Sequence, residues 1–561
     1  MRRKDCSTAN AIGTLRAVLV GTAVLALACP AAMAASRTCD NLLHERLSNI
    51  EVTSAAEVIE TLPAAELVPE RGPGAQSVSP YLRNMPRFCR VKATLSPVPK
   101  SRIGIELWLP EQWNGKLLGI GNHGFGGNFE YGDMAMGLQR GYAVVTTDTG
   151  HSATKEEGKS DFNIGSAEFA AGNDVAVDDF AWRAFHEMTV AAKKLVLLKY
   201  GVPQRRAYFF GCSNGGRHAM REVQQFPADY DGVIAGSAAQ YWTRFTVGSL
   251  IQFQAAVLPS GAKMSQAKLA LATRSAVAAC DRLDGVADGV AADREHCRWD
   301  PHTIECKAGD NPGTCLTSEE AAAIKRIEDP ITDPATGEML YAGMTPGSEE
   351  FWWRNVAALN RVTANYFRYM VLDPSWLDAD AAKANVVELI RKSELPGAPG
   401  VRINSINPDL SAFRDHGGKL IQYHGWNDPA MAPGFHPRYY AQVIDLQPGP
   451  DREARAARTQ SFYRLFMAPG MAHCYGGAGA VNFGGLDHRP LPTIDADHDV
   501  LAALDRWVEK GVAPDRMIAT EFDSAKNPKR QMPICAYPKI AAYVSGDVNR
   551  PDSFACKAPA N

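Results

Sequence analysis

The chain has 561 residues, of which 45% are hydrophobic and 22% are charged, and its formal net charge is −3. This composition is typical of a folded globular protein and excludes a disordered or fibrous chain. The near-neutral charge, without a run of Lys and Arg interleaved with aromatic residues, argues against nucleic acid as a partner. The length allows three or four domains, or one core that carries a large insertion.

The N-terminal segment, residues 1–34, has the pattern of a secretory signal peptide. Basic residues precede an apolar run over 17–28, and Ala32–Ala34 forms an A-x-A cleavage site. The run is too short to cross a bilayer. We therefore expect a mature chain that begins near Ala35, is secreted or periplasmic, and has no stable membrane association.

Removal of this segment leaves ten cysteines, an even number that favours disulfides in an exported chain. No CxxC pair occurs, so zinc is not expected. The ten are Cys39, Cys89, Cys212, Cys280, Cys297, Cys306, Cys315, Cys474, Cys535 and Cys556.

Residues 35–236 alternate short apolar runs with amphipathic stretches. The runs RIGIELWLP, GKLLGIGNHG and YAVVTTDTG are followed by the helical pattern FHEMTVAAKKLVLLKYG and a further strand in RRAYFFGCSNGG. This alternation predicts a mostly parallel α/β sheet. The same pattern returns over 408–561 in GGKLIQYHGWND, SFYRLFMAPGMAHC and HDVLAALDRWVEKG, which predict strand, strand and helix.

Residues 237–407 break this pattern. They contain alanine-rich helical stretches, four of the ten cysteines, the Trp-rich segment SEEFWWRNV and many Asp-Pro and Gly turns. We interpret this region as a lid that is inserted between the two parts of the core.

The stretch GCSNGG, Gly211–Gly216, places Ser213 between a predicted strand and a predicted helix. A GxSxG match can arise by chance, but a strand, a sharp turn and a helix form the setting in which a serine becomes an exposed nucleophile. The N–H of Asn214 would then lie at a helix N-terminus, free to bind a developing oxyanion. The alternative is a glycine-rich turn with a bystander serine.

A serine nucleophile requires a base and an orienting carboxylate, which follow it in this fold in the order acid, histidine. His473 follows the predicted strand SFYRLFMA, and Asp428 ends the predicted strand in KLIQYHGWND. The rivals are His424, within that apolar strand, and Asp415, which precedes it. The glycine-rich loop GIGNHGFGG, 119–127, is the candidate source of a second oxyanion donor.

Several motifs together resemble the tannase and feruloyl esterase family of α/β-hydrolases, which includes mono(hydroxyethyl) terephthalate hydrolases. They are GCSNGGR, NDPA after YHGW, PGMAHC, CDRLDGVADGV and PICAYPKIAAYVSGDVNRPDSFAC. The resemblance spans nearly the whole mature chain and implies an α/β-hydrolase core with a large inserted lid domain. It implies Ser213 as nucleophile, Asp428 as acid and His473 as base, with the backbone N–H groups of Asn122 and Asn214 as oxyanion hole.

The resemblance also implies five disulfides. One of them would join Cys212, just before the serine, to Cys474, just after the histidine, and would hold the two catalytic loops together. The other implied pairs are Cys39 with Cys89, Cys280 with Cys297, Cys306 with Cys315, and Cys535 with Cys556.

The acidic segment DRLDGVADGV is the second chemical feature. It places carboxylates at Asp281, Asp284 and Asp288, and its glycines allow the carbonyls of Val286 and Val290 to join them. Hard oxygen ligands suit Ca²⁺, although the spacing is not that of an EF-hand and a solvated acidic turn is the alternative. With the resemblance, we expect structural calcium here and no organic cofactor.

The lid segment SEEFWWRNVAALNRVTANYF offers candidates for substrate contact. Trp352 could stack on an aromatic ring, and Arg361 could bind a carboxylate or phenolic oxygen. Packing within the lid is the alternative for each aromatic side chain.

We therefore expect a secreted serine carboxylic ester hydrolase that cleaves small esters of aromatic acids through an acyl-enzyme. The acid would be of the feruloyl, galloyl or terephthaloyl monoester type. A serine peptidase on the same fold and a non-catalytic, calcium-stabilised binding protein are the alternatives.

Overall fold

The computed structural model describes residues 36–63, 79–153, 164–484 and 491–559. The expected signal peptide, 1–34, and its cleavage site lie outside the described residues. Among the helices described, none is long and apolar enough to span a membrane.

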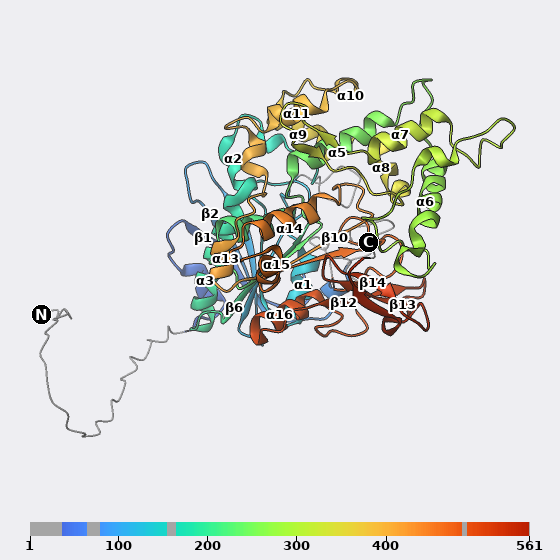
Figure 1. Ribbon diagram of the computed structural model, residues 1–561. Helices are drawn as coiled ribbons and strands as arrows, with labels where there is room; N and C mark the ends of the chain where they lie inside the picture. The colour runs from blue at the N-terminus through green and yellow to red at the C-terminus, as the bar shows by residue number, and fades with distance from the viewer. Residues whose placement is uncertain (1–35, 64–78, 154–163, 485–490, 560–561) are drawn as a thin grey trace, which may run out of the picture.

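A nine-stranded sheet forms the centre of the molecule, in the order β1-β2-β3-β5-β4-β6-β7-β10-β11 (Figure 1). The strands from β5 to β11 in this order run parallel to their neighbours, whereas the pairs among β1, β2, β3 and β5 are antiparallel. The mostly parallel α/β sheet is therefore confirmed, and β1 and β2 extend it beyond the predicted strands. The bounds are β1 Ile50–Glu60, β2 Met85–Leu95, β3 Ile103–Pro110, β4 Lys116–Ile120, β5 Ala143–Thr147, β6 Arg206–Cys212, β7 Gly232–Gly236, β10 Lys419–Gly425 and β11 Tyr463–Ala468.

Helices cover both faces of this sheet, which explains the continuous apolar sequences of its central strands. Alternate residues of one strand point to opposite faces, so Leu117 of β4 packs in one hydrophobic cluster and Leu118 packs in the other. The first cluster includes side chains of α3 (Ala184–Tyr200) and α4 (Asn214–Gln225), and the second includes those of α1 (Tyr131–Gln139) and α16 (Val500–Lys510). The core thus lies in two layers around the sheet.

The chain between β7 and β10 adds no strand to the central sheet. Its helices gather on one side of the sheet, at the top of Figure 1, and form the inserted lid. The lid contains α5 Trp242–Ala255, α6 Gln266–Cys280, α7 Ser318–Glu328, α8 Trp353–Ala357, α9 Arg361–Tyr366, α10 Asp378–Ala381, α11 Val386–Ser393 and α12 Pro399–Ile403, with a small hairpin of β8 Ile331–Thr332 and β9 Met339–Tyr341. The next helix, α13 (Ser411–Asp415), leads into β10, and α14 (Phe435–Asp445) and α15 (Arg452–Gln460) lie between β10 and β11.

Two small antiparallel sheets near the C-terminus were not among the predicted elements. β12 (Arg516–Phe522) pairs with β13 (Pro528–Cys535), and β14 (Ile540–Tyr543) pairs with β15 (Phe554–Lys557). Figure 1 shows these strands beside the central sheet, and β14 contacts the 281–284 segment of the acidic loop. They therefore connect the end of the chain to the lid.

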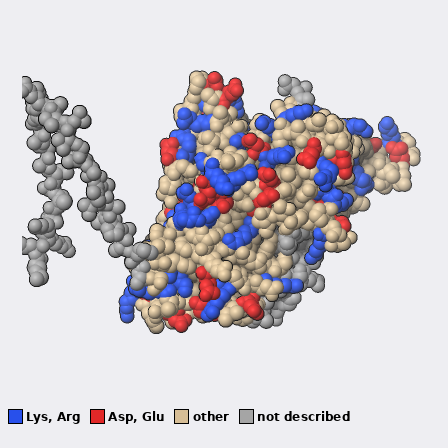
Figure 2. Space-filling view, turned by 90° about the horizontal axis from the view of Figure 1, so that it is seen from below, with Lys and Arg blue, Asp and Glu red and all other residues tan. Residues whose placement is uncertain are grey.

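All ten cysteines of the expected mature chain form disulfides, in the five pairs that the resemblance implied. On the face shown in Figure 2, basic and acidic side chains are interspersed, in keeping with the small net charge.

Candidate active site

Four loops that carry predicted site residues follow the carboxyl ends of parallel strands. Asn122 follows β4, Ser213 follows β6, Asp428 follows β10 and His473 follows β11. Carboxyl ends of parallel strands share one edge of the sheet, where open α/β sheets place their ligand sites. The lid begins after β7, at this same edge.

Ser213 lies in a sharp turn between β6 and α4. Its backbone has φ 62° and ψ −123°, a conformation that a non-glycine residue adopts at a cost of about 1–3 kcal/mol. Backbone hydrogen bonds hold the turn: the N–H of Ser213 donates to Gly236 and its carbonyl accepts from Arg217 and Ala239, all at 3.0 Å. This is the geometry of a nucleophile turn, with the serine at the end of a strand and the start of a helix.

The glycines of GCSNGG are required by the packing of this turn. A Cβ on Gly211 would lie 2.5 Å from the carbonyl carbon of Gly215, and a Cβ on Gly216 would lie 2.3 Å from the carbonyl oxygen of Gly236. Both distances are far below van der Waals contact. The glycines of the motif therefore allow the backbones of β6, α4 and β7 to approach one another closely.

Asp428 and His473 form a hydrogen-bonded pair. Nδ1 of His473 lies 2.8 Å from Oδ2 of Asp428, whose other oxygen accepts the N–H groups of Ala430 at 2.8 Å and Met431 at 3.1 Å. Asp428 is fully buried, whereas 28% of the His473 side chain is exposed. This arrangement orients the imidazole and leaves it one edge for proton transfer.

Burial alone would raise the pKa of Asp428. The neighbouring His473 and His424 and the N–H of Ala430 outweigh burial and hold the pKa of this carboxyl below its ordinary value. Asp428 is therefore an anion in the neutral pH range and can stabilise a positive charge on His473.

The rival residues occupy other positions. His424 is fully buried in β10, where its ring stacks on His436 with 3.8 Å between centroids. Its Nε2 lies 3.5 Å from Oδ2 of Asp428, and burial lowers the pKa of its imidazole to about 4. Asp415 ends α13 and pairs with Arg414 before β10 begins. His424 is thus a neutral neighbour of the acid, and Asp415 lies at the opposite end of the strand.

The disulfide between Cys212 and Cys474 joins the serine turn to the histidine loop. Its Cα atoms are 5.9 Å apart, and the N–H of Cys474 also donates to the hydroxyl of Ser237 at 3.1 Å. Each cysteine is the direct neighbour of a site residue. The bridge therefore limits the separation of Ser213 and His473.

Asn122 and Asn214, the predicted sources of the oxyanion hole, contact each other and are fully buried. The N–H of Gly215 donates to the carbonyl of Asn122 at 2.6 Å, and the side-chain amide of Asn214 donates to Oδ1 of Asn122 at 3.1 Å. The backbone N–H groups of Asn122 and Asn214 take no part in the backbone hydrogen bonds of the described loops.

The loop that carries Asp428 also contacts the lid, through a residue pair that the sequence analysis did not predict. Arg294 donates to Oδ1 of Asn427 at 3.2 Å, and the amide of Asn427 donates to the carbonyl of Gly347 at 2.8 Å. Asn427 directly precedes Asp428. No local sequence signal marks this pair, because Arg294 and Asn427 are 133 positions apart.

The acidic loop in the lid is folded by its own carboxylates. Asp281 accepts the N–H groups of Asp288 at 3.1 Å and of Gly289 at 3.0 Å, and Asp284 accepts that of Val286 at 3.1 Å. The carboxylate of Asp288 also bonds the guanidinium of Arg530 from β13.

One oxygen of this loop, Oδ2 of Asp284, is buried without a hydrogen-bond partner. Burial, followed by the negative charge of Asp281, raises the pKa of Asp284 to about 6. Among the described residues, one group of three side chains lies close enough together to hold a metal ion: Cys39, Glu57 and Cys89, whose cysteines form a disulfide. The carboxylates of Asp281, Asp284 and Asp288 are farther apart than these ligand atoms.

Trp352, predicted as a stacking surface, is fully buried, and its indole N–H donates to the hydroxyl of Ser348 at 2.9 Å. Tyr366 and Phe367 are buried as well. These rings expose no face to a ligand and pack within the lid, the alternative that the sequence left open. Arg361 is exposed at the first position of α9, and its contact with a substrate stays a prediction.

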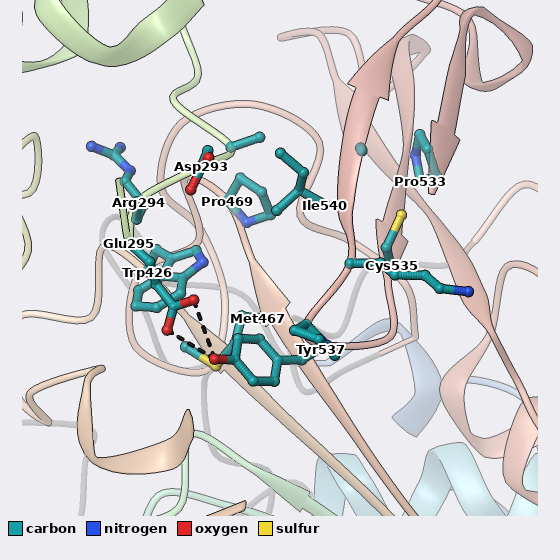
Figure 3. Close-up of a pocket in the computed structure, with 14 residues that line it drawn as sticks. Asp293, Arg294, Glu295, Trp426, Met467, Pro469, Pro533, Cys535, Tyr537 and Ile540 are labelled. Atoms are coloured by element: carbon teal, nitrogen blue, oxygen red, sulfur yellow. Dashed lines mark hydrogen bonds between the residues drawn. The ribbon is translucent and has the colours of Figure 1, made fainter. Parts of the chain in front are cut away.

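A small cavity of about 20 Å³ lies between the lid, the C-terminal strands and the loops that follow β10 and β11 (Figure 3). Trp426 and Met467 line it from the ends of β10 and β11, and the hydroxyl of Tyr537 donates to Glu295 of the lid at 2.9 Å. A space of this size holds about one water molecule. It belongs to the packing that supports the two loops and is too small for an aromatic ester.

The fold and this site define the chain as an α/β-hydrolase. The model of the tannase and feruloyl esterase family matches residues 89–557. The chain belongs to this family, and it is an ester hydrolase of the tannase and feruloyl esterase type.

Individual relatives agree with this assignment over nearly their whole lengths. An uncharacterized esterase of Xanthomonas campestris pv. campestris is 35% identical, over 93% of this chain and 91% of its own. Feruloyl esterase C of Talaromyces stipitatus is 31% identical, over 93% of this chain and 94% of its own. The crystal structure of feruloyl esterase B from Aspergillus oryzae superposes with a TM-score of 0.81 at 28% identity, and the match covers 92% of this chain and 99% of that one.

Proposed function

We propose that this chain is a serine carboxylesterase that hydrolyses small esters of aromatic acids through an acyl-enzyme. The hydrogen-bonded pair of Asp428 and His473, linked by the Cys212–Cys474 disulfide to the strained turn of Ser213, carries the proposal. The kinship with feruloyl esterases favours a feruloyl-type acid among the candidate acyl groups.

In the first half of the reaction, Nε2 of His473 accepts the hydroxyl proton of Ser213 while the serine oxygen attacks the ester carbonyl. The N–H groups of Asn122 and Asn214 bind the negative charge on the former carbonyl oxygen. Collapse of this tetrahedral intermediate breaks the ester bond, and the alcohol leaves with the proton from His473. Asp428 stabilises the imidazolium throughout.

In the second half, a water molecule gives a proton to His473 and attacks the acyl carbon. The second tetrahedral intermediate breaks the bond to Ser213, which recovers its proton from His473, and the aromatic acid is released. The strained backbone of Ser213 and the fixed disulfide keep the reacting groups in place without a metal in either step.

A substrate panel tests this proposal. We expect hydrolysis of one or more of methyl ferulate, methyl gallate and mono(hydroxyethyl) terephthalate, and a loss of kcat of at least about a thousandfold in Ser213→Ala. Ser461→Ala, which changes an exposed serine, serves as the control. A folded wild-type protein without activity on any ester would favour the binding protein, and a fully active Ser213→Ala variant would refute the mechanism.

We also propose that the acidic loop binds a structural Ca²⁺. The side chains of Asp281, Asp284 and Asp288 and the carbonyls of Val286 and Val290 would supply hard oxygen ligands. One observation supports the fit: the buried Oδ2 of Asp284 lacks a hydrogen-bond partner among the described residues. The ion would stabilise the contact between the lid and the C-terminal sheets.

Elemental analysis of chelator-free protein tests the calcium proposal. We expect about one Ca²⁺ per chain, a lower Tm after treatment with EDTA, and recovery of the Tm with Ca²⁺ but not in Asp284→Asn. Absence of bound calcium together with a Tm that does not respond to EDTA would contradict it.

We further propose that the protein is exported, because five disulfides persist only in an oxidising compartment in most organisms. N-terminal sequencing of the protein from culture medium and periplasm is expected to begin near Ala35. Retention of Met1 would contradict export by a cleaved signal.

A further inference from the structure

Arg217 is a fully buried cation that the proposed reaction does not use. It lies in the first turn of α4, and its side chain belongs to the largest fully buried ones in the described chain. It is the last residue of the GCSNGGR motif, one helical turn after Ser213.

Within the part of the chain that the structure describes, the hydrogen-bond acceptors of the guanidinium include no carboxylate. Nε donates to the side-chain oxygen of Asn214 at 2.8 Å. The terminal nitrogens donate to the carbonyls of Ala181 at 2.8 Å, Ile403 at 3.1 Å and Phe180 at 3.1 Å. One of them also lies 2.6 Å from Nε2 of His218, which is itself 2.9 Å from the carbonyl of Phe180.

The burial of this charge is unfavourable for stability. Moving a cation out of water without an anionic partner has a large desolvation cost, and apolar side chains of similar volume often stabilise such a position better. Contacts with the rings of Phe180, 4.8 Å away, and Trp242, 5.6 Å away, offset only part of it. Burial, followed by the charge of Arg221, lowers the pKa of Arg217 well below its ordinary value. A stability role alone does not account for an arginine here.

Arg217 determines the orientation of two side-chain amides in series. A guanidinium only donates, so the amide of Asn214 must direct its oxygen to Arg217 and its nitrogen away. That nitrogen donates to Oδ1 of Asn122 at 3.1 Å, which in turn directs the amide nitrogen of Asn122 to the carbonyl of Thr147, 3.5 Å away. The chain of bonds thus links α4 to the loop after β4.

The two residues at the ends of this link supply the two N–H groups of the proposed oxyanion hole. We propose that Arg217 is a positioning residue of the oxyanion hole: through Asn214 it holds the peptide groups of Asn214 and Asn122 at the separation that the tetrahedral intermediate requires. Its positive charge, which hydrogen-bonds no carboxylate among the described residues, also favours the negative charge that develops on the substrate oxygen. This inference rests on the proposed acyl-enzyme mechanism.

Arg221 provides a matched control on the same helix. It is partly buried, and its guanidinium donates to the carbonyls of Arg402, at 2.6 Å, and Asn404, beside the carbonyl of Ile403 that Arg217 binds. It makes no bond to Asn214 among the hydrogen bonds of the described residues. Loss of Arg221 therefore removes similar packing but leaves the amide chain intact.

The experiment compares Arg217→Lys, Asn214→Ala and Arg221→Lys in the full-length exported protein. Lysine retains the charge but lacks the planar set of donors, and Asn214→Ala breaks the link while it retains the backbone N–H. The readouts are kcat and KM on the ester that the wild type hydrolyses, the Ki of an aryl boronic acid, which forms a tetrahedral anion on a nucleophilic serine, and the Tm.

We expect kcat to fall about 10- to 100-fold in Arg217→Lys and in Asn214→Ala, with a parallel rise in the boronic acid Ki and a KM within about threefold of wild type. Arg221→Lys is expected to lower the Tm but to change the Ki by less than about twofold.

An unchanged Ki in Asn214→Ala, or an equal rise of Ki in Arg221→Lys, would overturn the inference while the mechanism stands. If Arg217→Lys does not fold, the boronic acid Ki of Asn214→Ala alone tests the inference. A wild-type enzyme that fails to bind the boronic acid, or an active Ser213→Ala variant, would instead overturn the proposed mechanism and the inference with it.

Discussion

Gly121 illustrates how a single missing Cβ shapes this site. It precedes Asn122, and a Cβ at this position would lie 2.5 Å from the Cα of Gly215. The three nearest atoms, two of Gly215 and one of Gly211, all belong to the backbone and cannot rotate away. The loop after β4 and the first turn of α4 approach so closely only because both residues are glycine.

We predict that Gly121→Ala lowers kcat at least about tenfold, because the Cβ would separate Asn122 from Asn214 and widen the oxyanion hole. Steady-state kinetics with methyl ferulate, or whichever ester is hydrolysed best, measure this change. Gly313→Ala is the control, since a Cβ there meets only the side chain of Asn311, at 3.3 Å. Equal kcat values in the two variants would contradict the prediction.

At the scale of elements, the site depends on loops from distant parts of the sequence that are brought to one edge of the sheet. The Cys212–Cys474 bridge connects the loops after β6 and β11, which are 262 positions apart, and Arg294 and Asn427 connect the loop after β10 to the lid. Closure of so long a loop stabilises a folded chain by about 5 kcal/mol in a chain-entropy model. Because the bridge lies beside Ser213 and His473, it also limits the distance between these two residues.

We predict that replacement of both Cys212 and Cys474 by alanine lowers the Tm and also lowers kcat at least about tenfold in the protein that remains folded. Thermal unfolding and kinetics at a temperature well below the Tm separate the two effects. Removal of the Cys306–Cys315 disulfide, whose cysteines are 9 positions apart within the lid, is expected to leave kcat unchanged. A double variant that keeps the wild-type kcat would show that the disulfide acts on stability alone.

For the whole molecule, a pair of neighbouring carboxyls in the lid makes stability depend on pH. Burial, followed by the charge of Glu349, raises the pKa of Glu328 far above its ordinary value, and Glu349 itself accepts the N–H of Gly347 and the hydroxyl of Thr273. The folded protein therefore keeps the Glu328 proton to a higher pH than the unfolded chain, which releases it near pH 4.3. Since the folded state binds more protons above that pH, the free energy of unfolding falls as the pH rises.

We predict that Glu328→Gln removes this fall in the free energy of unfolding at high pH. Relative to wild type, the variant gains at least about 1 kcal/mol in the free energy of unfolding when the pH is raised from 5 to 9. Denaturant unfolding at both pH values measures it, with the exposed Glu388→Gln as control. A difference between variant and wild type that does not change with pH would contradict the assignment.

Much of the site could be predicted from the sequence because its signals are local. The turn at Ser213, the carboxylate at the end of β10 and the histidine after β11 each lie within a short motif, and strand order alone brings them to one edge. The two C-terminal sheets were missed because their strands, such as PKRQMPIC, mix exposed charged residues with buried ones and lack a clear alternation.

The sequence by itself predicted the α/β class, Asp428 and His473 as the candidate acid and base and, through the family resemblance, the disulfide pairs, since each depends on short motifs and their order along the chain. Only the tertiary structure showed that Trp352 is buried within the lid, that Arg530 lies against Asp288, and that Arg217 donates to the side chain of Asn214. These contacts join segments such as Arg217 and Ile403, 186 positions apart, and burial of this kind leaves no periodicity in the sequence from which it could be inferred.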